Sequence, residues 1–171
     1  MVVVAPPPRS INGWLVLEPG DRRLATGTVP GTKIRLTLRR EVLPFFLALA
    51  ADYNETIEPL ALGKNDDGGY CYRQSRVNPN WSNHASGTAM DLNWSGHGSR
   101  NLANRKWWSL KRNKTAIDVI KQRYKIVNWG GDWSDRYYDP MHWELKKGTS
   151  VADVERLIDK LGIDPKGVRA R

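Results

Sequence analysis

Short stretches of this chain alternate between apolar and polar residues, as half-buried strands do. In residues 33–38, Ile34, Leu36 and Leu38 fall on one face and Lys33 and Arg35 on the other, a period of two that predicts a strand. Five further strands are expected at 14–17, 70–77, 88–94, 126–129 and 142–145.

Three other segments have the period of an amphipathic helix. The first, at 41–54, has apolar residues at i, i+3, i+4 and i+7 and a proline in its first turn, where proline is well tolerated. The second is expected at 115–124. The third, at 150–161, begins with Ser150 and Asp153 at the spacing of a capping box.

Polar segments between these elements predict loops. Residues 65–69 read Asn-Asp-Asp-Gly-Gly and predict a tight turn. Residues 95–114 are polar and basic, and predict a surface excursion anchored by Trp107 and Trp108. Because strands and helices are mixed without regular β-α-β alternation, we expect an α+β fold with a mainly antiparallel central sheet and flanking helices.

The length of 171 residues is typical of one domain. We expect a flexible lead-in at 1–10, which contains three consecutive prolines, and one monomeric domain at 11–171. Cys71 is the only cysteine, so an internal disulfide and a cysteine-rich zinc site are both excluded. Cys71 itself is expected to be a small buried residue.

The net charge of +9 is concentrated in one part of the chain. Residues 1–99 hold 10 basic and 9 acidic residues, whereas residues 100–171 hold 17 and 9. A basic region of this kind indicates a polyanionic partner. Nucleic acid, anionic lipid and the anionic polymers of a bacterial wall all qualify, and charge alone does not choose among them.

The beginning of the chain has no basic segment before its short apolar run, unlike a secretory signal peptide. No segment approaches the roughly 20 apolar residues of a membrane span. We therefore expect synthesis in the cytoplasm without membrane insertion, and action on any external target only after release.

Two of the three histidines stand in a pattern suited to metal binding. His84 and Asp91 are seven residues apart with Gly87 between them, so a loop turning into a strand would bring them together. His142 begins another predicted strand and can supply a third ligand. Catalytic zinc takes three protein ligands and keeps one position open. His97 lies in a Ser-Gly-His-Gly loop and is expected at the surface.

The segment around His142 also offers candidates for acid–base chemistry. Asp139 lies three residues earlier in an Asp-Pro turn, from which its carboxylate could accept a proton from water and later protonate the departing amine. Glu144 would face the same way as His142, and would either orient a ligand or act as an alternative base. Trp133 and Trp143 flank the site and are expected to contact substrate.

These residues together resemble a known peptidase family, the zinc D-alanyl-D-alanine carboxypeptidases and L-alanyl-D-glutamate endopeptidases. The family includes VanY-like enzymes and bacteriophage endolysins, and the resemblance covers roughly residues 30–147. The shared elements are Ser82-x-His84-x-x-Gly87-x-Ala89-x-Asp91, Asp139-x-x-His142, the upstream pair Tyr72-Arg73, and Trp129-Gly-Gly-Asp-Trp133.

The resemblance implies a fold shared with the Hedgehog signalling domain and one Zn²⁺ held by the two histidines and Asp91, with Asp139 as the base. It implies that Arg73 binds a substrate carboxylate or the developing oxyanion, for which a guanidinium is suited. Ser82 would support the site and its substrate by hydrogen bonding. Because carboxypeptidase members often have Glu where this chain has Asp139, we expect an endopeptidase-like member.

The sequence thus favours a zinc peptidase that cuts peptidoglycan stem peptides, of the endolysin type and acting at L-Ala–D-Glu. The alternative within the family is a D,D-carboxypeptidase that removes terminal D-Ala. Two alternatives of other classes are a non-catalytic basic module that binds polyanions and a Hedgehog-like zinc domain without catalysis. The basic C-terminal region would attract anionic wall polymers, and no nucleic-acid partner is expected.

Overall fold

The computed structural model describes residues 6–60 and 65–170. The strands are β1 (Leu24–Thr28), β2 (Arg35–Arg39), β3 (Ala89–Asp91), β4 (Val127–Trp129) and β5 (His142–Leu145). The helices are α1 (Leu43–Thr56), α2 (Trp94–His97), α3 (Asn104–Ser109), α4 (Lys111–Arg123) and α5 (Val151–Leu161), with the 3-10 turns η1 (Asn83–Ser86) and η2 (Gly130–Asp132). This mixture agrees with the predicted α+β class.

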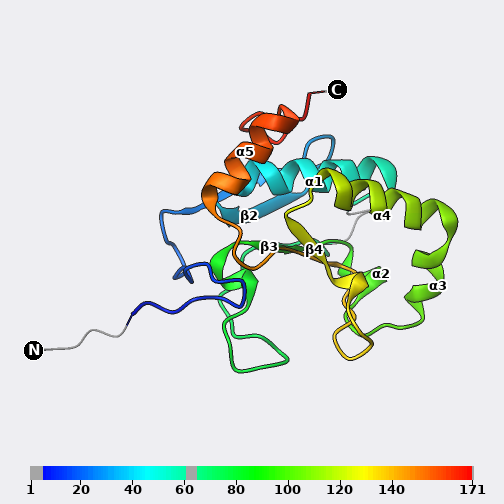
Figure 1. Cartoon of the computed structure of the whole chain (residues 1–171), viewed down its shortest axis with the longest axis horizontal. Helices are drawn as coiled ribbons and strands as arrows, with labels where there is room; N and C mark the ends of the chain where they lie inside the picture. The colour runs from blue at the N-terminus through cyan, green and yellow to red at the C-terminus, as the bar shows by residue number, and fades with distance from the viewer. Residues whose placement is uncertain (1–5, 61–64, 171) are drawn as a thin grey trace, which may run out of the picture.

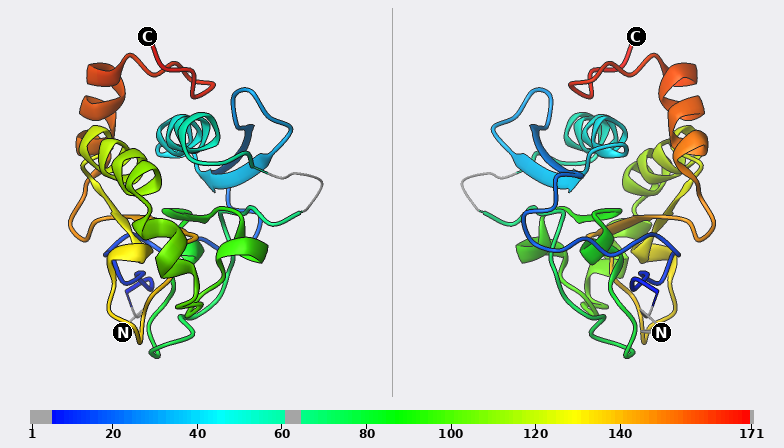
Figure 2. Two further views of the ribbon diagram at one scale, coloured as in Figure 1. Left: turned by 90° about the vertical axis from the view of Figure 1, so that its right-hand side faces the viewer. Right: turned by 90° about the vertical axis from the view of Figure 1, so that its left-hand side faces the viewer.

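The strands form two small antiparallel sheets. β1 pairs with β2, and the second sheet has the order β3-β5-β4. Figures 1 and 2 show α1, α4 and α5 on one side of the three-stranded sheet, and the irregular loops on the other. Since successive side chains of a strand point to opposite faces, each strand of this sheet has one face toward the helices and one toward the loops.

The helix-facing side of the sheet belongs to the hydrophobic core. Met90 of β3 and Trp143 and Leu145 of β5 are fully buried there. The ring of Trp143 packs edge-on against Tyr53 of α1, with 6.5 Å between centroids. Trp143 therefore lies in the core and not beside the site as expected, because strand alternation turns it away from His142 and Glu144.

Several elements follow the sequence pattern closely. Helix α1 spans nearly the predicted range and has its proline at the first helical positions. Helix α5 begins with the expected capping box, in which Ser150 and Asp153 each accept a hydrogen bond from the other's backbone N–H. Leu36 and Leu38 of β2 are fully buried on one face, as the alternation predicts.

The segment 95–114 is more structured than predicted, because it contains α2, α3 and the start of α4. His97 is only 7% exposed, so its expected surface position is wrong. Its ring lies 4.8 Å from those of both Trp107 and Trp108, and its Nε2 is 2.7 Å from Glu58 Oε1. The contact with Glu58 joins residues far apart in sequence, which a local pattern does not reveal.

Other local expectations are also corrected. Residues 65–69 form no turn; Gly68 instead exchanges two backbone hydrogen bonds with Asp91. The strands expected at 14–17 and 70–77 are reduced to isolated bridges, and β3 is shorter than 88–94 because Asn93 adopts a left-handed conformation. Cys71 is exposed.

The expected lead-in lies partly outside the described residues, since 1–5 are not among them. At its end, Ser10 is buried and donates a hydrogen bond to Ser86 at 2.9 Å. In the part of the chain that the structure describes, no helix has both the length and the apolar character needed to cross a membrane.

The turn at Gly87, which leads from η1 into β3, generates the first prediction. Gly87 has φ +68°, and a Cβ there would lie 2.5 Å from the backbone N of Arg39. We expect Gly87→Ala to reduce the free energy of unfolding by more than the roughly 1–2 kcal/mol that a left-handed alanine costs, because the β2 backbone must also shift.

The matched control is Gly148→Ala, where φ is +83° and nothing lies within 4 Å of the added Cβ. Urea unfolding of both variants measures the difference. Equal losses would show that the approach of Gly87 to Arg39 contributes nothing beyond backbone strain.

Candidate metal centre

Three elements bring His84, Asp91 and His142 together. The hydroxyl of Ser82 accepts a hydrogen bond from the His84 backbone N–H and caps η1. Gly87 then turns the chain into β3, where Asp91 stands directly opposite His142 of β5. The pairing of β3 with β5 thus supplies two of the residues, and the capped turn η1 supplies the third.

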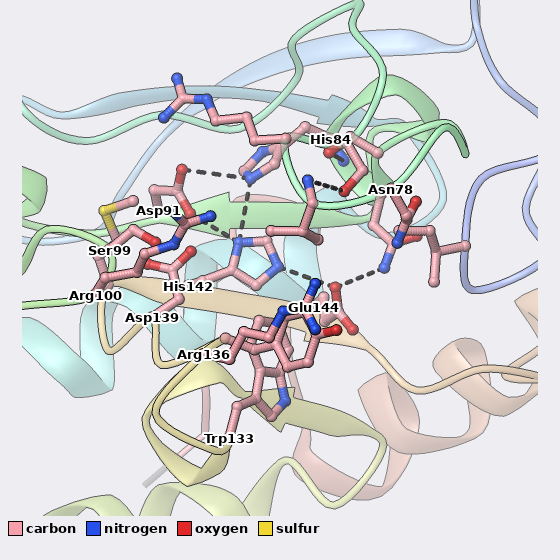
Figure 3. A pocket seen from close by; sticks show the side chains of 18 of the residues that line it. Asn78, His84, Asp91, Ser99, Arg100, Trp133, Arg136, Asp139, His142 and Glu144 are labelled. Carbon is pink, nitrogen blue, oxygen red and sulfur yellow. Dashed lines mark hydrogen bonds and ion pairs between the residues drawn. The ribbon is translucent and has the colours of Figure 1, made fainter.

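One side-chain nitrogen or oxygen from each of His84, Asp91 and His142, the triad, points toward a common position (Figure 3). The distance from His84 Nε2 to His142 Nδ1 is 3.2 Å, that from His84 Nε2 to Asp91 Oδ2 is 3.4 Å, and that from His142 Nδ1 to Asp91 Oδ1 is 2.8 Å. In a tetrahedral zinc site with nitrogen and oxygen ligands, the ligand atoms lie about 3.4 Å from one another. The donor set and its spacing therefore fit a zinc ion.

Hydrogen bonds on the far side of each ring prepare both histidines for a metal. His84 Nδ1 is 2.6 Å from the carbonyl oxygen of Gly69, and His142 Nε2 is 3.0 Å from Glu144 Oε2. Both partners are acceptors, so these two nitrogens carry the protons. His84 Nε2 and His142 Nδ1, the nitrogens that face Asp91, are then the ones that would bind a metal in place of a proton, as in metal-binding histidines.

The charges of the triad are strongly coupled. Burial by itself would raise the pKa of Asp91, but the charge of His84 and hydrogen bonds from both histidines lower it. Burial alone would lower the pKa of His142, but hydrogen bonds to Asp91 and Glu144 raise it to about 10. Without a metal, His142 therefore holds a proton between two carboxylates, and a bound cation would replace that proton.

Asp139 lies beside the triad, and one of its carboxylate oxygens has no hydrogen-bond partner. Its Oδ1 is buried without a hydrogen-bond partner, and burial raises its pKa to about 6. Its backbone N–H donates to the Gly130 carbonyl at 3.0 Å, while its own carbonyl accepts from the His142 N–H. The backbone of Asp139 is thus fixed, and its buried oxygen is free to accept a hydrogen bond.

The triad and Asp139 open into a cavity of about 800 Å³. Among the other expected site residues, Arg73, Ser82, Trp133 and Glu144 also line it. The ring of Trp133 is 5.4 Å from that of His142. Arg73 is half-buried and donates a hydrogen bond to the carbonyl oxygen of the neighbouring Gln74 at 3.3 Å. The cavity therefore contains all the expected site residues except Trp143.

Several residues of the site are missed by sequence reasoning. Gly69 contributes only a backbone carbonyl, which no side-chain pattern could reveal. Asn83 donates to Glu144, and its place beside His84 in the motif was the only available signal. Arg76, Arg100 and Arg136 also line the cavity, although the sequence indicates only a generally basic region.

Comparison with known proteins bears on the same segment. Residues 76–145 match the model of an M15 peptidase family described as D-alanyl-D-alanine carboxypeptidase. No curated protein and no solved structure matches the chain. The matched segment contains the triad and Asp139 but not Arg73. The match supports a metallopeptidase related to this family, and does not distinguish a carboxypeptidase from an endopeptidase.

Proposed function

We propose that the protein is a zinc-dependent hydrolase that cleaves peptide bonds in the stem peptides of bacterial peptidoglycan. The observation that carries this proposal is the convergence of His84, Asp91 and His142 on one point, with Asp139 beside them and its buried oxygen unpartnered. The family match over residues 76–145 supports the substrate class.

A zinc ion held by the triad would polarise the scissile carbonyl and lower the pKa of water to about 7. Asp139, at the edge of the same cavity, accepts a proton from the attacking water and transfers it to the departing amine. Arg73 binds a substrate carboxylate or stabilises the oxyanion. Ser82 holds the His84 turn, and Trp133 contributes an apolar wall for substrate.

Glu144 has a different role from Asp139 in this proposal. Its carboxylate accepts hydrogen bonds from the His142 ring and from Asn83, and hydrogen bonding to these groups outweighs its burial and lowers its pKa. A carboxylate engaged in this way orients its histidine rather than taking protons from water. We therefore assign the base to Asp139 and the positioning of His142 to Glu144.

Two scissile bonds remain as candidates. Because aspartate is shorter than the glutamate often found at this position in carboxypeptidases, we favour an endopeptidase of the endolysin type that cleaves L-Ala–D-Glu. The description of the matched family favours the second candidate, a D,D-carboxypeptidase that releases terminal D-Ala. In either case the basic region 100–171 would hold the enzyme near anionic wall polymers.

Digestion of purified peptidoglycan tests the function and separates the candidates. We expect the wild-type protein to release cut stem peptides, detected by mass spectrometry, and a chelator to abolish release because the triad then lacks its metal. Free D-Ala as the main product would identify the carboxypeptidase instead. Wall binding that survives chelation without any cleavage would favour the non-catalytic polyanion-binding module.

The triad itself generates a prediction about metal content. We expect His84→Ala to lose stoichiometric zinc and part of its stability, since metal binding is coupled to folding. The control is His97→Gln, which disturbs the other buried histidine and its contact with Glu58. It should lower the melting temperature yet retain zinc. A full zinc complement in His84→Ala, measured by mass spectrometry, would contradict the ligand assignment.

Substitutions of Asp139 and Glu144 should have different effects, the first on the catalytic rate and the second on zinc affinity. Asp139→Asn should keep zinc but lose at least ~100-fold in rate, the usual effect of removing a general base. Glu144→Ala should weaken zinc affinity by roughly 10–100-fold and recover activity in excess zinc. Asp118→Asn is the control for Asp139, because Asp118 pairs with Lys114 on α4. If instead Glu144→Ala binds zinc normally and is inactive, the base is Glu144.

A further inference from the structure

Four arginines line the cavity that contains the candidate metal centre: Arg73, Arg76, Arg100 and Arg136. Within residues 6–60 and 65–170, none of the four has a carboxylate oxygen within 4.0 Å. Some arginines outside the cavity are paired with a carboxylate, as Arg105 is with Asp135 at 2.6 Å. The cavity thus gathers cationic side chains that lack an anionic partner.

The two loops that hold Arg100 and Arg136 are fastened to each other. Arg100 adopts φ +61°, which is uncommon for a residue other than glycine, and its N–H donates to the Tyr138 carbonyl at 2.7 Å. Arg105 lies over the Tyr138 ring at 4.6 Å while it pairs with Asp135. The backbones on both sides are therefore fixed beside the metal centre.

Figure 3 shows these two arginines in different places around His142. In this view Arg100 is drawn on the side of Asp91 and Asp139, and Arg136 on the side of Glu144 and Trp133, and all of them line the same cavity. A peptide whose scissile bond sits at the triad would therefore meet a guanidinium on more than one side. Arg76 lies on another segment of the cavity wall, residues 75–78, apart from the two loops that hold Arg100 and Arg136.

Unpaired guanidinium groups suit a carboxylate ligand. Arginine stays charged at any working pH, accepts no hydrogen bonds, and matches a carboxylate with two parallel N–H groups. Burial raises the pKa of Asp139 and the charge of Arg76 opposes this only in part, and Asp139 Oδ1 receives no hydrogen bond from any arginine of the cavity. The donors of these arginines therefore point to a group that arrives with the substrate.

We propose that Arg76, Arg100 and Arg136 select stem peptides whose residues next to the scissile bond carry free carboxylates, over the same peptides with carboxamides. This inference rests on the proposed peptidase function and names its preferred substrate. A phosphate-bearing wall polymer is the less favoured ligand, because the arginines surround the reaction site rather than an outer surface. The preference should weaken with salt, since exposed charges are screened.

The test compares two synthetic stem peptides of one sequence, with the carboxylates beside the scissile bond either free or converted to carboxamides. We expect wild-type kcat/KM to be at least ~10-fold higher for the acid peptide, in keeping with hydrogen bonds to charged groups. Arg100→Gln and Arg136→Gln should each reduce this ratio several-fold. The control Arg22→Gln, an exposed arginine outside the cavity, should leave the ratio unchanged.

The outcomes separate this inference from the function on which it rests. Equal cleavage of both peptides by the wild type would overturn the selectivity and leave the peptidase function intact. An unchanged ratio in both cavity variants, with normal zinc content, would remove these arginines from recognition. Cleavage of neither peptide by zinc-loaded protein would overturn both proposals. Inhibition by inorganic phosphate far stronger than by a dicarboxylate would assign the arginines to a phosphate-bearing ligand.

Discussion

The antiparallel pairing of β3 with β5 is the constraint on which the site depends. Its register places Asp91 opposite His142 and Ala89 opposite Glu144. Because side chains alternate along a strand, a slip of one residue would exchange the two faces. It would turn Trp143 toward the cavity and His142 into the core. The apolar residues that fix the core therefore also fix the candidate metal centre.

This arrangement concentrates charge where water is scarce, which is costly unless the charges are paired. Asp91, His142 and Glu144 form one hydrogen-bonded row, in which the imidazole lies between two carboxylates. A proton can neutralise part of the row, and a divalent cation can do so more completely. The interactions that stabilise these carboxylates in a half-buried position are thus the same ones that would favour a bound cation.

The sequence predicts well those structural features that depend on residues close to one another along the chain. The spacing in α1, the capping box of α5 and the alternation in β5 are local signals, and the structure contains all three. The proximity of His84, Asp91 and His142 was expected from a motif that includes the turn at Gly87. Expectations failed where a distant partner decides the outcome. Residues 65–69 pair with β3 instead of turning, and His97 is buried because Glu58 and two tryptophans surround it.

The division between sheet and loops has a consequence for function. The triad is held by a strand pair and a capped turn that the core fixes, whereas the arginines of the cavity stand on loops fastened by Arg105, Asp135 and the Tyr138 backbone. Loop residues of this kind can change without altering the register of the sheet. In the proposed enzyme, the chemistry of the centre and the choice of substrate would therefore be carried by separate parts of the chain, so a change in the loops would alter which peptide is cut and leave the metal ligands in place.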